Sequence, residues 1–339
     1  EASKQMIITS ITAKKILASL GNETIKATIN NTFSASVPAG ISAGKYEIKK
    51  VTPDEAIGQI GQISQICSGK DWTQESLDQE ISSHNFGGNA TLAVSAAFFK
   101  TQKISASKFP KLMLLLFEGG EHGNKNITIQ EFLVVEDTLE QAMRDFKTLN
   151  EYLIDKNIEH TVGAEGGFSP LKFTNDDVLK TIHEVLPNRQ IGVDMAQCFG
   201  ESRIPENIFS VEDPFDDESW SNWTNLTNLG KYLVIADDLT TTNPERIQKA
   251  IDLKACGAIV IKPNQIGTIT KAKEAANLAH DNNLKVVVSH RGEETDDVWI
   301  VDFALDVQAD FVKFGGMNRG ERIAKYNRLL ELLPPVSPG

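Results

Sequence analysis

Six short apolar runs in the second half of the chain each lead to a residue that can bind a metal ion or move a proton. Ile191–Val193 leads to Asp194, for example, and Ala258–Ile261 leads to Lys262. Apolar runs without alternation are typical of strands that are buried on both faces. The six residues at the ends of the runs are Asp194, Glu212, Asp237, Lys262, His290 and Lys313. If the strands are parallel neighbours, their ends meet at one edge and form a single polar site.

Three of these residues are acids at consecutive strand ends: Asp194, Glu212 and Asp237. Brought together without a counter-charge they would repel one another, and one would take up a proton. A hard divalent cation removes this conflict, and three oxygen ligands with room for water suit Mg²⁺ better than Zn²⁺. Each acid taken singly is equally well explained as a solvated surface residue or a helix cap. Their common register favours a metal site.

Two lysines, Lys262 and Lys313, end strands on the same predicted edge. An ammonium at the end of a buried strand is unfavourable unless a partner or a reaction uses it. Nearby positive charge lowers the pKa of a lysine, which would allow one of the two to act as a base. The alternative is that each lysine neutralises a structural carboxylate.

The elements that must position these residues repeat along the chain. Successive strand ends lie about 18 to 28 residues apart, which is the length of one strand-plus-helix unit of a parallel barrel. A doubly wound sheet would need the Gly-rich fingerprint of a dinucleotide-binding turn after a strand, and we find no such fingerprint in the sequence. We therefore expect an α/β fold in which residues 109–339 form a (β/α)₈ barrel.

The first hundred residues have a different pattern. Two β-forming segments, Met6–Leu17 and Thr24–Val37, flank the turn signal Leu20-Gly21-Asn22 and predict a hairpin. Helical periodicity follows over Pro53–Cys67, Gln74–Ser82 and Asn89–Gln102. We expect residues 1–108 to form a smaller N-terminal α+β domain.

Composition restricts the partners of the chain. The net charge of −12, from 34 basic and 46 acidic residues, argues against binding to nucleic acid or to a membrane surface. No apolar run approaches transmembrane length, and no signal-peptide core precedes the first strand. The three cysteines lack Cys-x-x-Cys spacing, which favours a reduced, cytoplasmic compartment.

Several segments resemble those of enolase, phosphopyruvate hydratase, and they occur in the same order nearly from end to end. They are V-P-A-G-I-S-A-G (37–44), G-G-E-H (119–122), I-Q-E-F (129–132), H-T-V-G-A-E-G-G-F-S-P (160–170), V-E-D-P-F (211–215), A-D-D-L-T-T-T-N-P (236–244), I-K-P-N-Q-I-G (261–267) and V-S-H-R (288–291). The resemblance implies an enolase-type barrel and a hydro-lyase that interconverts 2-phosphoglycerate and phosphoenolpyruvate. It also implies one tightly bound Mg²⁺, a second Mg²⁺ that arrives with substrate, and a homodimer or higher homo-oligomer.

The resemblance further implies a role for each matching residue. Lys262 would remove the C2 proton, with Asp238 as its partner, and Glu165, assisted by Glu131, would protonate the leaving C3 hydroxyl. Asp194, Glu212 and Asp237 would hold the tightly bound Mg²⁺, and Ser42 would help to hold the second. The substrate would be contacted by His122, Ser289, His290, Arg291 and Lys313, with Arg291 on the phosphate and Lys313 on the carboxylate.

Two departures from the family pattern bear on the substrate. Ala164 stands where the family usually has an aspartate beside the catalytic acid. Gly292-Glu293 follow Arg291 where the family has Ser-Gly, which removes one phosphate-binding hydroxyl and adds a carboxylate. Two alternatives therefore stay open. One is a paralogue that dehydrates a different acid or phosphorylated acid, and the other is a non-catalytic enolase-like binding protein.

Overall fold

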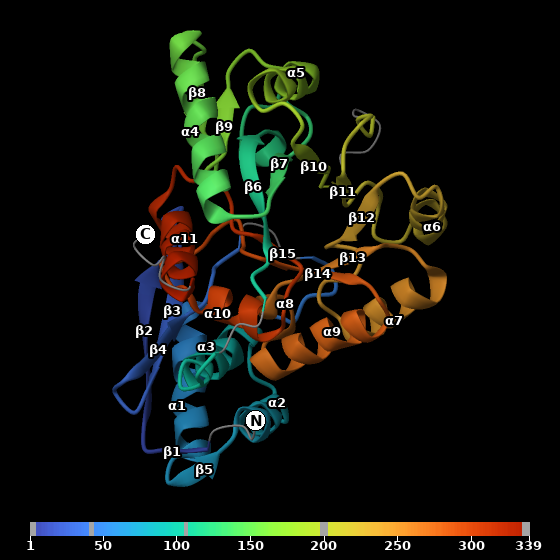
Figure 1. Ribbon diagram of the computed structural model, residues 1–339. Helices are drawn as coiled ribbons and strands as arrows, with labels where there is room; N and C mark the ends of the chain where they lie inside the picture. The colour runs from blue at the N-terminus through green and yellow to red at the C-terminus, as the bar shows by residue number, and fades with distance from the viewer. Residues whose placement is uncertain (1–4, 41–43, 105–107, 197–202, 334–339) are drawn as a thin grey trace, which may run out of the picture.

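A closed barrel of eight strands forms the larger part of the molecule (Figure 1). The computed structural model describes residues 5–40, 44–104, 108–196 and 203–333. Around the ring the strands are β6 (Lys111–Glu118), β7 (Glu131–Glu136), β10 (Gln190–Asp194), β11 (Ser210–Glu212), β12 (Leu233–Ala236), β13 (Ala258–Ile261), β14 (Lys285–Ser289) and β15 (Phe311–Lys313). β15 pairs back with β6 and closes the ring. The expected barrel is confirmed, and each of the six predicted strands is present.

One strand differs from the parallel pattern. β7 runs antiparallel to both of its neighbours, β6 and β10. The stretch 119–130 between β6 and β7 is fully described and contains one short 3₁₀ turn, Gly120–His122, and no helix. A parallel return requires a crossover of a dozen or more residues that is usually helical, whereas a short connection produces an antiparallel pair. As a result Glu131, the first residue of β7, lies in register with Asp194 and with Glu118, the last residues of its neighbours.

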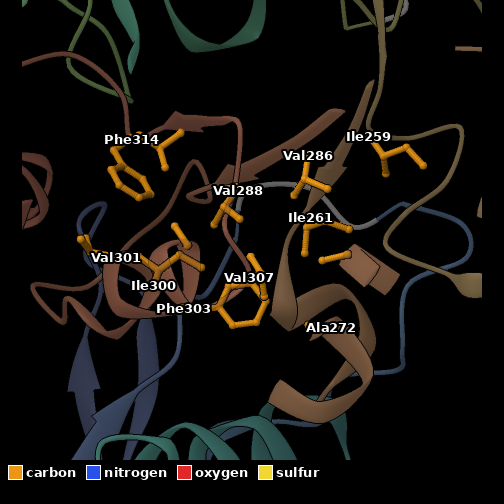
Figure 2. Packing of buried hydrophobic residues seen from close by; sticks show 14 of the residues in the cluster. Ile259, Ile261, Ala272, Val286, Val288, Ile300, Val301, Phe303, Val307 and Phe314 are labelled. Carbon is orange, nitrogen blue, oxygen red and sulfur yellow. The ribbon is translucent and has the colours of Figure 1, made fainter. Parts of the chain in front are cut away.

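Strand alternation divides the core of the barrel into two layers. Ala258 and Val260 of β13 belong to a cluster that fills the ring, together with Val287 and Phe311. Their neighbours along the strand belong to the larger cluster between strands and helices. Figure 2 shows residues of this outer layer, including Ile259, Ile261, Val286 and Val288 from the strands and Ala272 and Ile300 from the covering helices. Because side chains alternate with a period of two, the residue two positions beyond an inward residue also points into the ring.

The helices of the barrel lie outside the strands. They are α4 (Leu139–Asp155), α5 (Asn175–Val185), α6 (Trp220–Asn228), α7 (Pro244–Leu253), the short α8 (Pro263–Ile266), α9 (Ile269–Asp281), α10 (Trp299–Asp306) and α11 (Gly320–Leu332). A hairpin of β8 (His160–Val162) and β9 (Phe168–Pro170) joins the sheet beside β6. Among the described residues, no helix combines the length and the apolar composition that crossing a lipid bilayer would require.

The first hundred residues form a separate set of strands and helices, drawn in blue below the barrel in Figure 1. The elements are β1 (Met6–Ile8), β2 (Ile11–Leu17), β3 (Glu23–Ile29), β4 (Phe33–Ser36), α1 (Pro53–Cys67), β5 (Lys70–Trp72), α2 (Gln74–Ser82) and α3 (Gly88–Phe99). The predicted hairpin is present as the antiparallel pair β2–β3, but each predicted arm is broken into two strands. The first arm consists of β1 and β2, and the second consists of β3 and β4. Two of the predicted helices have the expected bounds, and the third begins one residue earlier and ends at Phe99.

Candidate active site

The strand ends surround a cavity of about 280 Å³ at one end of the barrel. Strand alternation explains why their side chains point into it. On β13 the inward residues Ala258 and Val260 are followed by Lys262, and on β15 Phe311 is followed by Lys313. Ten of the residues predicted for the site line the cavity: His122, Glu131, Glu165, Asp194, Asp237, Lys262, Ser289, His290, Arg291 and Lys313. Glu212 lies directly against Lys313, and Ser42 lies outside the described residues.

Lys313 lies at the centre of a cluster of carboxylates. Its Nζ is 2.9 Å from Asp194 Oδ2, 2.8 Å from Glu212 Oε1 and 3.1 Å from Glu131 Oε2. Burial alone would lower the pKa of Lys313, but these three carboxylates outweigh it and raise the pKa well above its usual value. The lowered pKa expected for one of these lysines depended on the positive charge of a metal ion facing it, and it stays a prediction. In the contacts described here, the three carboxylates determine the direction for Lys313.

Lys262 has a similar environment. Its Nζ forms an ion pair with Asp237 Oδ2, whose other oxygen accepts a hydrogen bond of 3.1 Å from Gln265 Nε2. Burial lowers the pKa of Lys262, and Asp237 more than compensates, so that the pKa is raised. The partner suggested by the sequence, Asp238, has a pKa raised to about 6, first by burial and then by Asp237. Lys262 is therefore a charged lysine in this structure.

Glu165 lies between two histidines. Its Oε2 is 2.8 Å from His290 Nε2, and its Oε1 is 3.4 Å from His122 Nδ1. Burial alone would raise the pKa of Glu165, but the imidazoles and then Arg322 hold it well below its usual range. Burial and Arg322 lower the pKa of His290 to about 4, so this ring is neutral near pH 7. A neutral imidazole still stabilises a carboxylate by donating its N–H.

Glu118 is a site residue that the sequence argument missed. Its carboxylate accepts hydrogen bonds from the backbone N–H groups of Glu165, at 2.7 Å, and Gly167, at 2.8 Å. Burial, and then repulsion by Glu165, raise the pKa of Glu118 to about 8. The carboxyl group of Glu118 thus supports the turn that carries Glu165, whereas Ala164 has no carboxyl group that could do so. The sequence contains a signal for Glu118, because this residue follows the apolar run Leu112–Phe117. The six predicted residues follow apolar runs in the same way.

The segment after Arg291 does not have the arrangement that the sequence suggested. Gly292 lines the cavity, but the Glu293 carboxylate accepts hydrogen bonds from Asn22 in the β2–β3 turn, at 3.2 Å from N and 3.0 Å from Nδ2. Glu293 is therefore bound to the first hundred residues. Glu293 is not among the residues that line the cavity. Of the two differences from the family pattern after Arg291, the hydroxyl missing at Gly292 is the one that affects the cavity lining.

The acids of this rim are suited to a divalent cation. Within the described part of the chain, two groups of ligand atoms lie within 4.8 Å of one another: His122, Glu131 and Glu165, and Asp213, Asp237 and Asp238. Glu212 Oε2 is a buried oxygen that accepts no hydrogen bond from any described residue, and burial followed by repulsion from Asp194 raises the pKa of this acid. Unpaired carboxylate oxygen is the ligand that Mg²⁺ prefers. Neither group of ligand atoms is the predicted set of Asp194, Glu212 and Asp237, of which only Asp237 belongs to one. These three acids suit such an ion by their chemistry, and Lys313 and Lys262 contact them here.

Comparison with known proteins agrees with the barrel fold. The family model for the enolase C-terminal TIM barrel domain matches residues 107–199 and 189–334. The chain is 30% identical to the enolase of Elusimicrobium minutum, over 96% of this chain and 95% of that one, and 30% identical to the enolase of Metallosphaera sedula, over the same shares. It is 29% identical to the enolase of Kineococcus radiotolerans, over 96% of this chain and 93% of the other. The chain belongs to the enolase family.

Proposed function

We propose that this protein is a Mg²⁺-dependent phosphopyruvate hydratase that interconverts 2-phosphoglycerate and phosphoenolpyruvate, a lyase reaction of glycolysis. The observation that carries the proposal is the single cavity lined by both a candidate base, Lys262, and a candidate acid, Glu165. They come from different parts of the rim, the end of β13 and the turn between β8 and β9. Removal of a carbon proton and departure of a hydroxyl from opposite faces requires two such groups.

Five of the described residues would bind the substrate or assist the leaving group. Lys313 lines the cavity, and its ammonium would bind the substrate carboxylate. Arg291 would bind the phosphate through its planar fork. Glu165 must be protonated before it can act as the acid, and an anionic substrate beside it raises its pKa toward that state. Glu131 and His290 would hold the leaving hydroxyl near it.

The acids Asp194, Glu212 and Asp237 would hold the metal. When bound, Mg²⁺ supplies positive charge beside Lys262 and the substrate carboxylate, which lowers the pKa of the lysine and stabilises the charge left when the proton departs. Ser42 is carried over from the resemblance as a ligand for a second ion. A homo-oligomer and a cytoplasmic location stay predictions of the sequence.

The test is an assay of the purified protein with 2-phosphoglycerate and Mg²⁺, followed by the ultraviolet absorbance of the enol product. Lys262→Ala and a chelator are run in parallel, and each should abolish product formation. In Lys262→Ala, proton exchange at C2 should also be lost. Absence of product in the unaltered protein with Mg²⁺ bound would contradict the proposal.

A second function is favoured by Gly292, which lines the cavity where the family has a phosphate-binding hydroxyl. The protein would then dehydrate a related acid with a different or missing phosphate. A panel of 2-hydroxy and 3-hydroxy acids, with and without phosphate, separates the two. Highest kcat/KM for 2-phosphoglycerate excludes the second function. A binding protein without catalysis would show no turnover of any acid in the panel.

A further inference from the structure

The side chain of Glu47 lies at the edge of the cavity in the position of an anionic ligand. It is 3% exposed, and its two oxygens each lie 3.1 Å from a terminal nitrogen of Arg291. Glu47 Oε1 also accepts a hydrogen bond of 2.9 Å from Gly44 N. A guanidinium fork together with a backbone N–H is the arrangement that proteins use to bind phosphate. Arg291 is thus engaged by a carboxylate of its own chain.

Lys50 brings a second cation to the same carboxylate. Its Nζ lies 3.9 Å from Glu47 Oε2 and donates a hydrogen bond of 3.1 Å to Ala39 O. Gly40 shows how close the two cations are, because a Cβ at this position would lie 3.1 Å from Lys50 Nζ and 3.2 Å from Arg291 Nη2. The pKa of Lys50 is lowered, first by burial and then by Arg291. Two neighbouring cations therefore share one carboxylate.

The charge at this corner is unlike that of the rest of the rim. Around Lys313 three carboxylates surround one ammonium, whereas here a guanidinium and an ammonium both lie within 3.9 Å of the Glu47 carboxylate. A phosphate ester carries more negative charge than a carboxylate and offers a third acceptor oxygen for Lys50. Gly292, which also lines the cavity, has no side chain to provide that donor.

We propose that Arg291 and Lys50 together form the phosphate subsite of this cavity, and that Glu47 is an internal anion which the phosphate displaces from them. Lys50 thereby takes the place of the hydroxyl missing at Gly292 and is a specificity-determining residue for phosphorylated acids. The inference rests on the proposed function for the identity of the substrate. The exchange of anions itself requires no turnover, so it can be tested separately.

The experiment is calorimetric titration of the full chain with inorganic phosphate in buffer containing Mg²⁺ at fixed ionic strength. Lys50→Met should weaken phosphate binding about tenfold, since it removes a charged donor. Glu47→Gln should strengthen binding several-fold, because the competing charge is gone while the shape is kept. Lys50→Arg should retain most of the affinity. Lys49→Met is the matched control, since Lys49 is the adjacent lysine and is exposed, and it should bind as the unaltered protein does.

Two results would overturn the inference. Equal affinities for Lys50→Met and Lys49→Met would remove Lys50 from the subsite. Unchanged or weaker binding in Glu47→Gln would mean that Glu47 holds Arg291 in place and does not compete with phosphate. Turnover of 2-phosphoglycerate is measured on the same samples. If phosphate affinity changes in the expected order but 2-phosphoglycerate is not turned over, the phosphate subsite is supported and the proposed function is contradicted. If 2-phosphoglycerate is turned over and either overturning result is found, the proposed function is supported and the phosphate subsite is contradicted.

Discussion

Buried lysines of this barrel each lie against a carboxylate. Lys313 contacts three, Lys262 contacts Asp237, and Lys325 Nζ lies 3.2 Å from Glu294 Oε2 with its side chain fully buried. Taking a charge out of water is unfavourable, and removing one partner leaves the other buried alone. Substitution of such an acid should therefore destabilise the protein more than substitution in an exposed ion pair.

The substitution Glu294→Gln tests this effect of burial, and the loss of stability that it causes should depend on pH. The change should reduce the free energy of unfolding by about 3 to 5 kcal/mol near pH 7, because Lys325 loses its charged partner. Burial alone would raise the pKa of Glu294, but Lys325 and Arg322 outweigh it and the pKa is lowered. An acid with a lowered folded pKa stabilises the protein above its unfolded pKa, near 4.5, and loses that contribution as the pH falls through the folded value. The difference between the two proteins should therefore be constant from pH 7 to pH 5 and shrink below that.

Urea unfolding at a series of pH values measures this difference. Glu331→Gln is the control, because Glu331 pairs with Arg328 at 3.0 Å while its side chain is 64% exposed. This exposed pair should contribute less than about 1 kcal/mol. Equal losses in the two variants would show that burial does not determine the effect.

At the scale of elements, the segment 44–50 is anchored on two sides. Glu47 points to Arg291, while the preceding residue, Tyr46, has its hydroxyl against Glu218. The guanidinium carbon of Arg246 on α7 lies 3.8 Å from the centre of the Tyr46 ring and 5.0 Å from that of Trp220. Arg246 Nη1 is also 3.2 Å from Glu218 Oε1. The segment thus joins the cavity edge to the outer helices.

Tyr46→Ala should loosen this segment without unfolding the barrel. Loss of the cation–π contact and of the hydroxyl contact, worth roughly 1 to 2 kcal/mol together, should speed amide hydrogen exchange over residues 44–50 by about tenfold. Tyr46→Phe keeps the ring and should show a smaller increase. Exchange within α4 (Leu139–Asp155), which packs against α5, β6 and β7, serves as the internal reference. Unchanged exchange over 44–50 in Tyr46→Ala would mean that Tyr46 does not anchor the segment.

At the scale of the whole molecule, polar contacts join the first hundred residues to the barrel. Asp297, just before α10, accepts a hydrogen bond of 2.8 Å from Ser36 N at the end of β4 and lies 2.6 Å from Lys100 Nζ after α3. Asp78 of α2 accepts from Thr270 N at 2.9 Å, at the start of α9. We propose that residues 1–108 and 109–339 are two domains that unfold as one cooperative unit because of these contacts.

Asp297→Ala tests the coupling between the two parts. Loss of its ion pair and hydrogen bonds should reduce the free energy of unfolding by about 2 to 4 kcal/mol and leave a single transition in urea. Asp296→Ala, at the exposed neighbouring position, should have little effect. Circular dichroism and tryptophan fluorescence are followed together. Two separate transitions in the unaltered protein would contradict the proposed cooperativity.

Local pattern was sufficient for much of this protein. The unbroken apolar runs predicted six strands of the ring, and the polar residue after each run predicted part of the rim, because side-chain alternation is a property of the strand alone. The acid Glu165 and the phosphate-binding Arg291 were implied only by the resemblance. The β2–β3 hairpin was likewise determined by its turn residues. The strands β6 and β7, and with them Glu118, could have been found by the same rule, since Leu112–Phe117 and Phe132–Val135 are equally apolar.

Partnership across the ring was decided only by the tertiary structure. The short connection after β6 makes β7 antiparallel, but the pairing of β7 with β10, which brings Glu131 beside Asp194, joins segments far apart in the sequence. Lys313 meets carboxylates from three other strands, and Glu293 binds Asn22 at the opposite end of the chain. The signs of the lysine pKa shifts follow from these contacts. A sequence specifies which residues end a strand, but the charge that each one meets depends on distances across the barrel, and those exist only once the ring has closed.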